Sequence, residues 1–364
     1  MYKYWILVPL ATLLLLELGL RLFWVNPYLL YGGFDQPFRL HEPGLVFYAR
    51  VDDDLYPGVH RIRFAVDQGR AISGGAKRHG EPRRAMALGG STTESGLVPE
   101  GRRWPDLLHT PAYNFGVAGN SSLDSYHNLK YLLEAGAVDV EDVLIMHAVN
   151  DLRSFLAGRM TDIDAWSPEP LANVLGTADQ ADQPILFGIR VKDSALLSFI
   201  RYQSNNLQGR SYYPSYLRQR KAQDGLPELG DEAFGGLMQK VQRELLPRRR
   251  EIYARIAELA RGGKVRLLLL TQPHAYDERF RPHRADLRLF PVYQNHKLTL
   301  SQAAGVLDTL NRQTRQLARD LGSRLIDVDA CFSGGDLGGW FYDSVHYTPA
   351  GSAKLAECVD GGLQ

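Results

Sequence analysis

The sequence has few of the features that point to a metal site or to nucleic-acid binding. Among 364 residues there are only two cysteines, and 42 basic residues nearly balance 41 acidic ones, which leaves a formal net charge of +1. This balance gives no electrostatic basis for binding nucleic acid. Histidine and cysteine do not gather in the tight ligand sets that zinc requires, so we expect no metal and no other cofactor. Internal repeats and low-complexity tracts are also absent from the sequence.

Long apolar stretches are scarce as well, apart from residues 4–25. Their charge-free core, residues 5–16, is shorter than the about 20 residues that cross a bilayer, although Glu17 and Arg21 can extend it by pairing on a helix. We expect an uncleaved, single-pass transmembrane signal anchor over residues 1–26. The rest of the chain would then be periplasmic or otherwise extracytoplasmic, because positive residues stay inside. The alternatives are a cleaved signal peptide and a buried amphipathic helix of a soluble domain.

The chain after residue 26 divides into two parts by pattern. Residues 27–83 are loop-rich, and we expect a membrane-proximal linker with a small β-rich segment. From residue 84 to 364, apolar runs alternate with helix-like segments, which is typical of an α/β fold with a parallel sheet covered by helices on both faces. The expected strands of this sheet are residues 85–88, 113–117, 143–147, 265–270 and 324–328. The expected helices are residues 103–109, 123–135, 232–260, 298–321 and 349–359.

An insertion at about residues 152–230 separates two units of the expected sheet. A loop of this length in a compact domain is uncommon unless it is functional or disordered. It carries an aromatic and basic cluster that includes Tyr212, Tyr213 and Tyr216. These rings suit the binding of a sugar-containing substrate. Ordinary packing of the loop onto the domain is the alternative interpretation.

Three polar residues suggest the chemistry of this chain. Ser91 follows the expected strand at residues 85–88, while Asp343 and His346 lie three residues apart on a loop before the last helix. Together they supply the nucleophile, the orienting carboxylate and the base of a serine hydrolase. Taken alone, the Asp343 and His346 segment is better interpreted as a polar turn that caps a helix beginning near Pro349.

Four segments strengthen the hydrolase interpretation because they occur in a fixed order at expected strand ends. They are Gly89-Gly90-Ser91-Thr92, Asn114-Phe115-Gly116-Val117-Ala118-Gly119-Asn120, His147-Ala148-Val149-Asn150-Asp151 and Asp343-Ser344-Val345-His346. In this order the chain resembles the SGNH (GDSL-like) hydrolase superfamily, and in particular its membrane-anchored cell-envelope members. Two positions depart from the usual pattern of that superfamily: Gly90 stands where Asp is usual, and Ala148 stands where Gly is usual.

The resemblance implies a flavodoxin-like three-layer fold and a role for each matched residue. Ser91 would be the nucleophile, His346 the base and Asp343 the residue that orients the histidine. The oxyanion hole would consist of the backbone N–H groups of Ser91 and Gly119 and the side-chain amide of Asn150.

The resemblance also implies the class of reaction. We expect a serine esterase that acts on acyl esters, chiefly acetyl esters, of a carbohydrate or other cell-envelope substrate. Its partners would include the membrane and an envelope polysaccharide machinery. One alternative is a polysaccharide O-acetyltransferase that uses the same triad, and another is a non-catalytic glycan-binding assembly protein.

Three further features remain open at the level of sequence. Cys331 and Cys358 flank the loop that carries Asp343 and His346, so a disulfide there would hold this loop in an oxidising compartment. Two unrelated buried thiols are the alternative. His147 is expected to be a buried core histidine, and the arginines at residues 248–250 are expected to lie on a solvated helix face.

Overall fold

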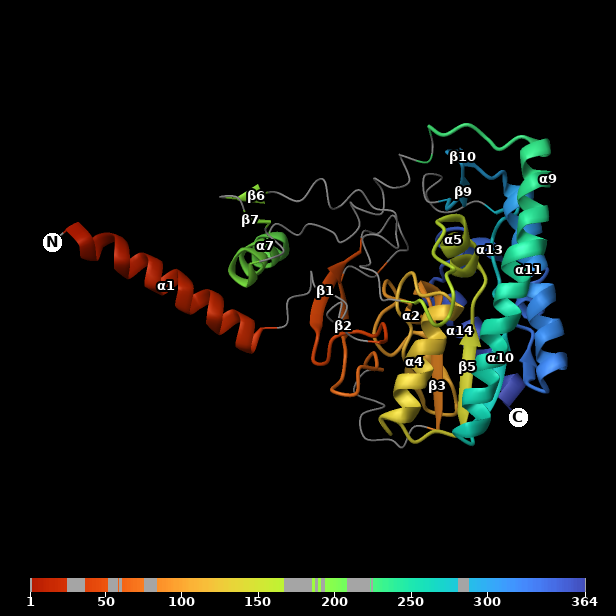
Figure 1. Cartoon of the computed structure of the whole chain (residues 1–364), viewed down its shortest axis with the longest axis horizontal. Helices are drawn as coiled ribbons and strands as arrows, with labels where there is room; N and C mark the ends of the chain where they lie inside the picture. The colour runs from red at the N-terminus through yellow and green to blue at the C-terminus, as the bar shows by residue number, and fades with distance from the viewer. Residues whose placement is uncertain are drawn as a thin grey trace.

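The computed structural model describes the chain at residues 2–24, 37–51, 58, 61–74, 84–166, 185–186, 189–190, 194–207, 223, 225–280 and 288–363. A five-stranded parallel sheet forms its centre (Figure 1). The strands of this sheet are β3 (Ala85–Gly89), β4 (Ala112–Asn114), β5 (Asp142–Met146), β8 (Arg266–Leu270) and β11 (Arg324–Ile326). The prediction of an α/β fold with a parallel sheet between helices is confirmed.

The order of the strands places the loops that carry the candidate residues next to one another. Across the sheet the order is β11-β8-β5-β3-β4. The chain therefore adds β4 on one side of β3 and then continues on the other side with β5. The carboxyl ends of β3 and β5 therefore lie at the point where the strand order reverses, which is where ligands bind in open α/β sheets. Ser91 follows β3, and Asn150 follows β5.

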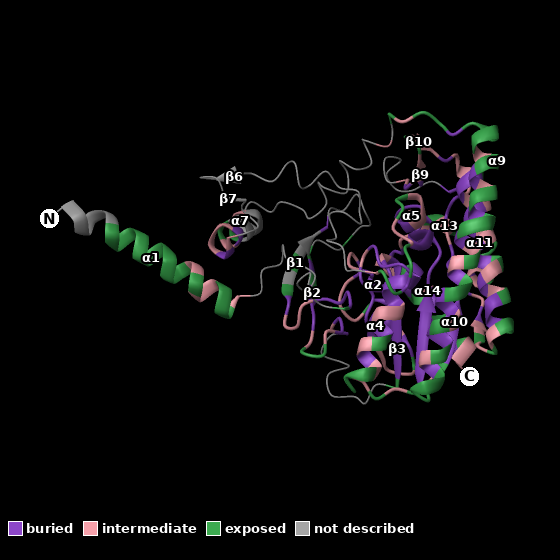
Figure 2. Ribbon diagram, in the orientation of Figure 1, coloured by how far each residue is buried: buried purple, intermediate pink, exposed green. Residues whose placement is uncertain are grey.

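The sheet is buried on both faces, as its apolar strands predict. Side chains of alternating residues point to opposite faces. Met86 and Leu88 pack in one cluster with helices α4 (Ser122–Glu134) and α10 (Leu246–Gly262). Ala85 and Ala87 pack in another cluster with α3 (Trp104–Leu107), α12 (Val328–Phe332) and α14 (Pro349–Leu363). Strands β3 and β5 are accordingly buried along their whole length (Figure 2), whereas the edge strands β4 and β11 are only partly buried.

The long helices around the sheet begin and end at recognisable signals. Helix α11 (Leu300–Leu321) starts with a capping box between Thr299 and Gln302 and ends at Gly322, whose φ is 64°. The helix expected over residues 232–260 is observed as α9 (Asp231–Lys240) and α10, joined by the π-helical turn η4 (Val241–Leu245). Pro247 explains the π turn, because proline cannot supply a helical N–H and its ring crowds the preceding turn.

The segment before the sheet is partly β-structured, as expected. Strands β1 (Val46–Arg50) and β2 (Arg61–Ala65) pair in antiparallel fashion. The backbone N–H of Ile72 then donates to the carbonyl of Asn114 at 2.8 Å, which joins this segment to edge strand β4. Smaller described elements are α2 (Ser91–Glu94), α5 (Val149–Leu156), β6 (Ile185–Leu186), β7 (Ile189–Arg190), β9 (Val292–Tyr293), β10 (His296–Lys297) and α13 (Leu337–Trp340).

The N-terminal helix α1 (Tyr2–Phe23) contacts helix α7 (Ala195–Leu207). Glu17 accepts hydrogen bonds from Ser194 Oγ and from the backbone N–H groups of Ala195 and Leu196, at 2.8–3.0 Å. It thus caps α7. Among the described residues, no helix is long and apolar enough to cross a membrane. The expected transmembrane anchor is therefore not found there, and the charges of Glu17 and Arg21 interrupt the apolar part of α1.

Candidate active site

Ser91, His346 and Asp343 form a continuous chain of hydrogen bonds. His346 Nε2 lies 2.7 Å from Ser91 Oγ, and His346 Nδ1 lies 2.7 Å from Asp343 Oδ2. Ser91 and His346 are 255 residues apart in sequence. The side chain of Asp343 is completely buried, and that of His346 is 13% exposed. The histidine therefore lies between the buried carboxylate of Asp343 and the partly exposed hydroxyl of Ser91.

Two hydrogen bonds within the loop that carries His346 hold Asp343 in place. Asp343 Oδ1 accepts the backbone N–H groups of Val345 and His346, at 2.8 and 2.7 Å. These bonds fix the carboxylate, whose other oxygen faces Nδ1 of the imidazole. Nδ1 is therefore the protonated nitrogen, which leaves Nε2 free to accept the proton of Ser91.

The candidate oxyanion groups lie beside this serine. The side-chain amide of Asn150 donates to the carbonyl of Asn120 at 2.9 Å, and Gly119 adopts a φ of 79° that favours glycine. Gly90 has no room for a side chain, because a Cβ there would lie 1.9 Å from Asn150 Nδ2. The glycine that departs from the usual superfamily pattern thus allows Asn150 to approach the nucleophile turn.

A buried glutamine joins the ends of three strands at the site. Gln272, which follows β8, accepts the backbone N–H of Val149 at 3.0 Å through Oε1, and its Nε2 faces Thr92 Oγ1 at 3.4 Å. Asn311 of α11 holds the backbone of Gln272 on both sides, with two hydrogen bonds of 2.9 Å. Ala148 has a φ of −153°, which lies outside the positive range that favours glycine.

The sequence predicts that Arg249 lies on a solvated helix face, and that prediction is wrong. Its side chain is completely buried, as is that of Asp151, and Arg249 Nε lies 2.7 Å from Asp151 Oδ2. Asp151 Oδ1 accepts the backbone N–H of Ser122 at 2.7 Å, and Arg249 also donates to the carbonyl of His147 at 3.0 Å. The pair therefore braces the two segments that carry Gly119 and Asn150.

A helical pattern in the sequence could have identified Arg249 as buried. Ile252, Tyr253 and Ile256 are buried residues of α10 at spacings of three, four and seven from Arg249. Residues at these spacings share one face of a helix. The neighbouring Arg248 and Arg250 fall off that face, and their side chains are 27% and 64% exposed.

A second serine–histidine pair lies in the core. Ser125 Oγ is 2.8 Å from His147 Nε2, and the two residues are 0% and 1% exposed. Burial lowers the pKa of His147, so this imidazole stays neutral. Since neither residue is accessible to a substrate, we interpret the pair as a structural hydrogen bond, which is the role expected for His147.

The remaining candidate residues have different outcomes. Tyr212, Tyr213 and Tyr216 lie outside the described residues. Cys331 and Cys358 are joined in a disulfide that links α12 to α14. Within the described part of the chain, no group of three or more His, Cys, Asp or Glu side chains is arranged to hold a metal ion.

Comparisons with known proteins give structural likeness alone. No protein-family model matches the chain, and no curated protein is similar to it in sequence. Among solved structures, it is similar to an acetyl xylan esterase with a TM-score of 0.41 and 12% identity, over 77% of this chain and 100% of the other. An acetylxylan esterase from Geobacillus stearothermophilus gives a TM-score of 0.38 and 13% identity, over 79% and 96%.

An extracellular lipase from Streptomyces rimosus gives a TM-score of 0.38 and 16% identity, over 77% of this chain and 99% of the lipase. These structures share the α/β arrangement distantly.

Proposed function

We propose that this chain is a serine esterase that cleaves acyl esters through an acyl-enzyme intermediate. The observation that carries the proposal is the hydrogen-bonded series Ser91–His346–Asp343, with both bonds at 2.7 Å. Nucleophile, base and orienting group within such distances are the structural signature of nucleophilic catalysis.

The two hydrogen bonds of His346 give each residue of the triad its role. His346 Nε2 takes the proton of Ser91 while Oγ attacks the acyl carbon, and Asp343 stabilises the imidazolium that forms. The developing oxyanion would be stabilised by the backbone N–H groups of Ser91 and Gly119 and by the Asn150 amide. His346 then protonates the departing alcohol. Water attacks the acyl-enzyme in the second half of the reaction, with the same histidine as base.

For the substrate we propose an acetyl or other short acyl ester of a carbohydrate. This part of the proposal rests on the resemblance of the four sequence segments to envelope members of the SGNH superfamily. An envelope polysaccharide machinery would be the setting in which such an ester is encountered.

The test is active-site labelling of the full chain with a fluorophosphonate probe, together with hydrolysis of 4-nitrophenyl acetate. We expect labelling and turnover in the wild type, and loss of both in Ser91→Ala and His346→Ala. Ser125→Ala serves as the matched control and should retain both. An unlabelled but folded wild type would contradict the proposal. Transfer of the acyl group to an added oligosaccharide instead of water would favour the acetyltransferase alternative.

We also propose that α1 attaches the protein to a membrane and that the rest of the chain is extracytoplasmic. Two observations support this localisation. Nine leucine and valine side chains of α1 are between 48% and 71% exposed and Phe23 is 89% exposed, and the Cys331–Cys358 disulfide suits an oxidising compartment. The exposed large apolar residues of α1 are Leu7, Val8, Leu10, Leu13, Leu14, Leu15, Leu16, Leu18, Leu22 and Phe23.

Flotation with phospholipid vesicles tests the membrane proposal. The full chain should float with the vesicles, and the double variant Leu14→Asp/Leu15→Asp should remain in the soluble fraction. Flotation of both proteins to the same extent would show that the apolar surface of α1 is not the attachment.

A further inference from the structure

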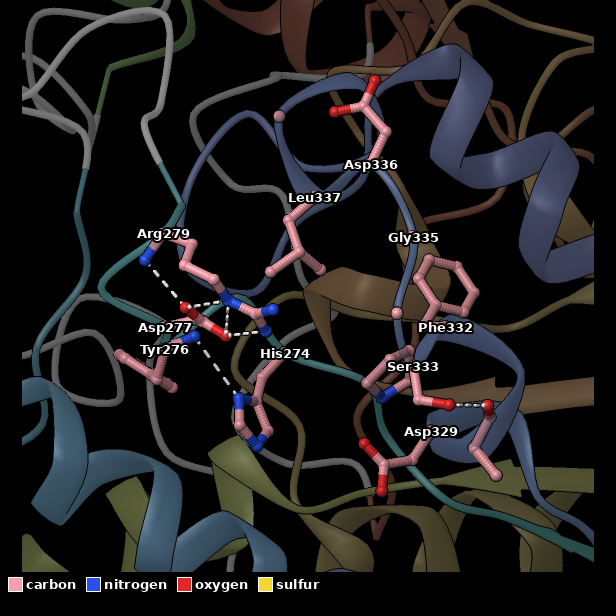
Figure 3. Close-up of a pocket in the computed structure, with 14 residues that line it drawn as sticks. His274, Tyr276, Asp277, Arg279, Asp329, Phe332, Ser333, Gly335, Asp336 and Leu337 are labelled. Carbon is pink, nitrogen blue, oxygen red and sulfur yellow. Dashed lines mark hydrogen bonds and ion pairs between the residues drawn. The ribbon is translucent and has the colours of Figure 1, made fainter.

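A cavity of about 440 Å³ lies beyond the carboxyl ends of β8 and β11 (Figure 3). Ser91, Asp343 and His346 are not among the residues that line it. His274, Asp277 and Arg279 stand on the wall formed by the segment after β8. Asp329, Phe332 and Ser333 stand on the opposite wall, formed by the segment after β11. Its volume falls within the range typical of small-molecule sites.

One wall of the cavity is bonded directly to the catalytic loop. The backbone N–H of Ala275 donates to the carbonyl of Ser344 at 2.8 Å, and Ser344 lies between Asp343 and His346. In the sheet, β8 is two strands from β3, which carries Ser91 at its end. Two strand spacings amount to roughly 10 Å. A short ester does not span the separation between these two strand ends, whereas an oligosaccharide does.

The polar groups of the cavity are charged and carry an excess of carboxylate. Arg279 Nε lies 3.0 Å from Asp277 Oδ1, and hydrogen bonds from Arg279 lower the pKa of Asp277 to about 2. Asp329 is paired with Arg315 at 2.8 Å, but that same guanidinium is shared with Asp327. Asp336 on the rim accepts the backbone N–H of Gly339 at 3.1 Å.

This lining restricts the class of ligand. An aliphatic acyl chain would remove water from ionised carboxylates without replacing their hydrogen bonds, which is unfavourable. An anionic group would be repelled by the excess of aspartates, and a cationic group would have to compete with Arg279 and Arg315 for Asp277 and Asp329. Hydroxyl groups suit the site, because each carboxylate oxygen keeps lone pairs that accept further hydrogen bonds. Phe332 and Leu337 add apolar surface that can contact the C–H face of a ring.

We propose that this cavity binds a neutral, hydroxyl-rich sugar unit of the alcohol part of the ester, and thereby selects carbohydrate esters over simple ones. The inference rests on the proposed esterase function, since the bound sugar would present its ester to Ser91. Asp277, Asp329 and Ser333 are specificity residues in this account and take no part in bond cleavage.

Direct binding tests the cavity independently of catalysis. Cellotetraose, an oligogalacturonate and a chitosan oligomer are titrated calorimetrically into the full chain carrying Ser91→Ala. The neutral oligosaccharide should bind, and Ser333→Trp, which places a bulky ring from an exposed position into the cavity, should weaken binding about tenfold or more. Ser301→Trp, at an exposed position of α11, is the matched control and should leave binding unchanged. No binding of cellotetraose, or tighter binding of either charged oligomer, would overturn the proposal.

Kinetics then separate this inference from the proposed function. With Ser91 intact, Ser333→Trp and Asp277→Asn should raise KM for an acetylated neutral oligosaccharide about tenfold, and leave kcat/KM for 4-nitrophenyl acetate within about twofold. If the variants lose kcat/KM equally on both substrates, or lose it on neither, the cavity is not the sugar site. The proposed esterase function would be unaffected by that result. If the wild type hydrolyses neither ester and Ser91 is unlabelled, the proposed function itself fails.

Discussion

At the scale of single residues, Gly90 stands where the nucleophile turn comes closest to the Asn150 amide. A Cβ at this position would lie 1.9 Å from Asn150 Nδ2 and 3.0 Å from the carbonyl of Asn120. The second contact is with backbone, so Asn150 is the group that must move. The proposed oxyanion hole therefore depends on Gly90, although Gly90 contributes no functional group to it.

We predict that Gly90→Ala lowers kcat for a short acyl ester by about 10²-fold, comparable to the loss of one oxyanion donor. KM should change little, because the displaced amide acts in the transition state. The measurement is steady-state kinetics with thermal unfolding as the folding control. Full activity in a folded Gly90→Ala protein would remove Asn150 from the proposed oxyanion hole.

Arg249 is the residue whose environment was least evident from the sequence. A run of three arginines ordinarily indicates a solvated surface, and only the register of Arg249 with the apolar face of α10 distinguishes it from its neighbours. The proposed triad of Ser91, Asp343 and His346 is easier to identify, because its residue types and their order in the sequence are those of a serine hydrolase. The ion pair of Arg249 with Asp151 depends on tertiary packing between residues 98 positions apart.

We predict that Arg249→Ala lowers the free energy of unfolding by about 3–5 kcal/mol, because Asp151 is left as an uncompensated buried charge. Arg249→Lys keeps the charge but loses the forked geometry, and it should recover only part of the stability. Chemical denaturation measures both. Arg248→Ala, one residue away and partly exposed, should change stability by less than about 0.5 kcal/mol. Equal effects of Arg248→Ala and Arg249→Ala would contradict this assignment.

At the scale of elements, the strands and most helices could be predicted because local patterns decide them. The apolar runs after residue 84 mark strands buried on both faces, and all five are found in one parallel sheet. The strand order could not be obtained in this way, since it depends on which hydrophobic faces meet. The contact between α1 and α7 could not be predicted from the sequence either, because it joins Glu17 to backbone groups about 180 residues away.

The contact between α1 and α7 should depend on pH. Burial acts to raise the pKa of Glu17, but hydrogen bonds from Leu196, Ala195 and Ser194 outweigh it and lower the pKa to about 2, from an ordinary value of 4.5. A carboxyl with a lowered pKa in the folded state contributes stability above its ordinary pKa. That contribution is lost as the pH falls from about 4.5 towards 2.

Hydrogen exchange of a peptide spanning residues 194–200 measures this effect, after correction for the intrinsic rate at each pH. We expect protection at pH 6 and reduced protection at pH 3, while a peptide from β5 stays protected. Glu17→Gln should show reduced protection at both values. Protection that is independent of pH in the wild type would indicate that Glu17 does not cap α7.

At the scale of the whole molecule, the Cys331–Cys358 disulfide ties the last helix to the segment after β11, which forms one wall of the cavity. The closed loop spans 27 residues and contains Asp343 and His346. Both cysteines could be found in the sequence, but their pairing could not, because proximity depends on how α14 packs against α12.

We predict that Cys331→Ser/Cys358→Ser lowers the free energy of unfolding by about 3–4 kcal/mol, the value expected for a loop of this length. The double variant is compared with the oxidised wild type and with the wild type under a reducing agent. The reduced wild type should match the variant. An unchanged unfolding midpoint in both would show that the disulfide does not constrain the unfolded chain.

The most direct test of the central claim is to trap the acyl group on the protein during turnover. The wild-type chain is mixed with 4-nitrophenyl acetate, quenched in acid and digested, and the acetylated peptide is identified by mass spectrometry. The account predicts a transient acetyl group on Ser91 that accumulates and decays with turnover and is absent from His346→Ala. Turnover without an adduct on Ser91, or an adduct that appears instead on Ser125, would contradict it.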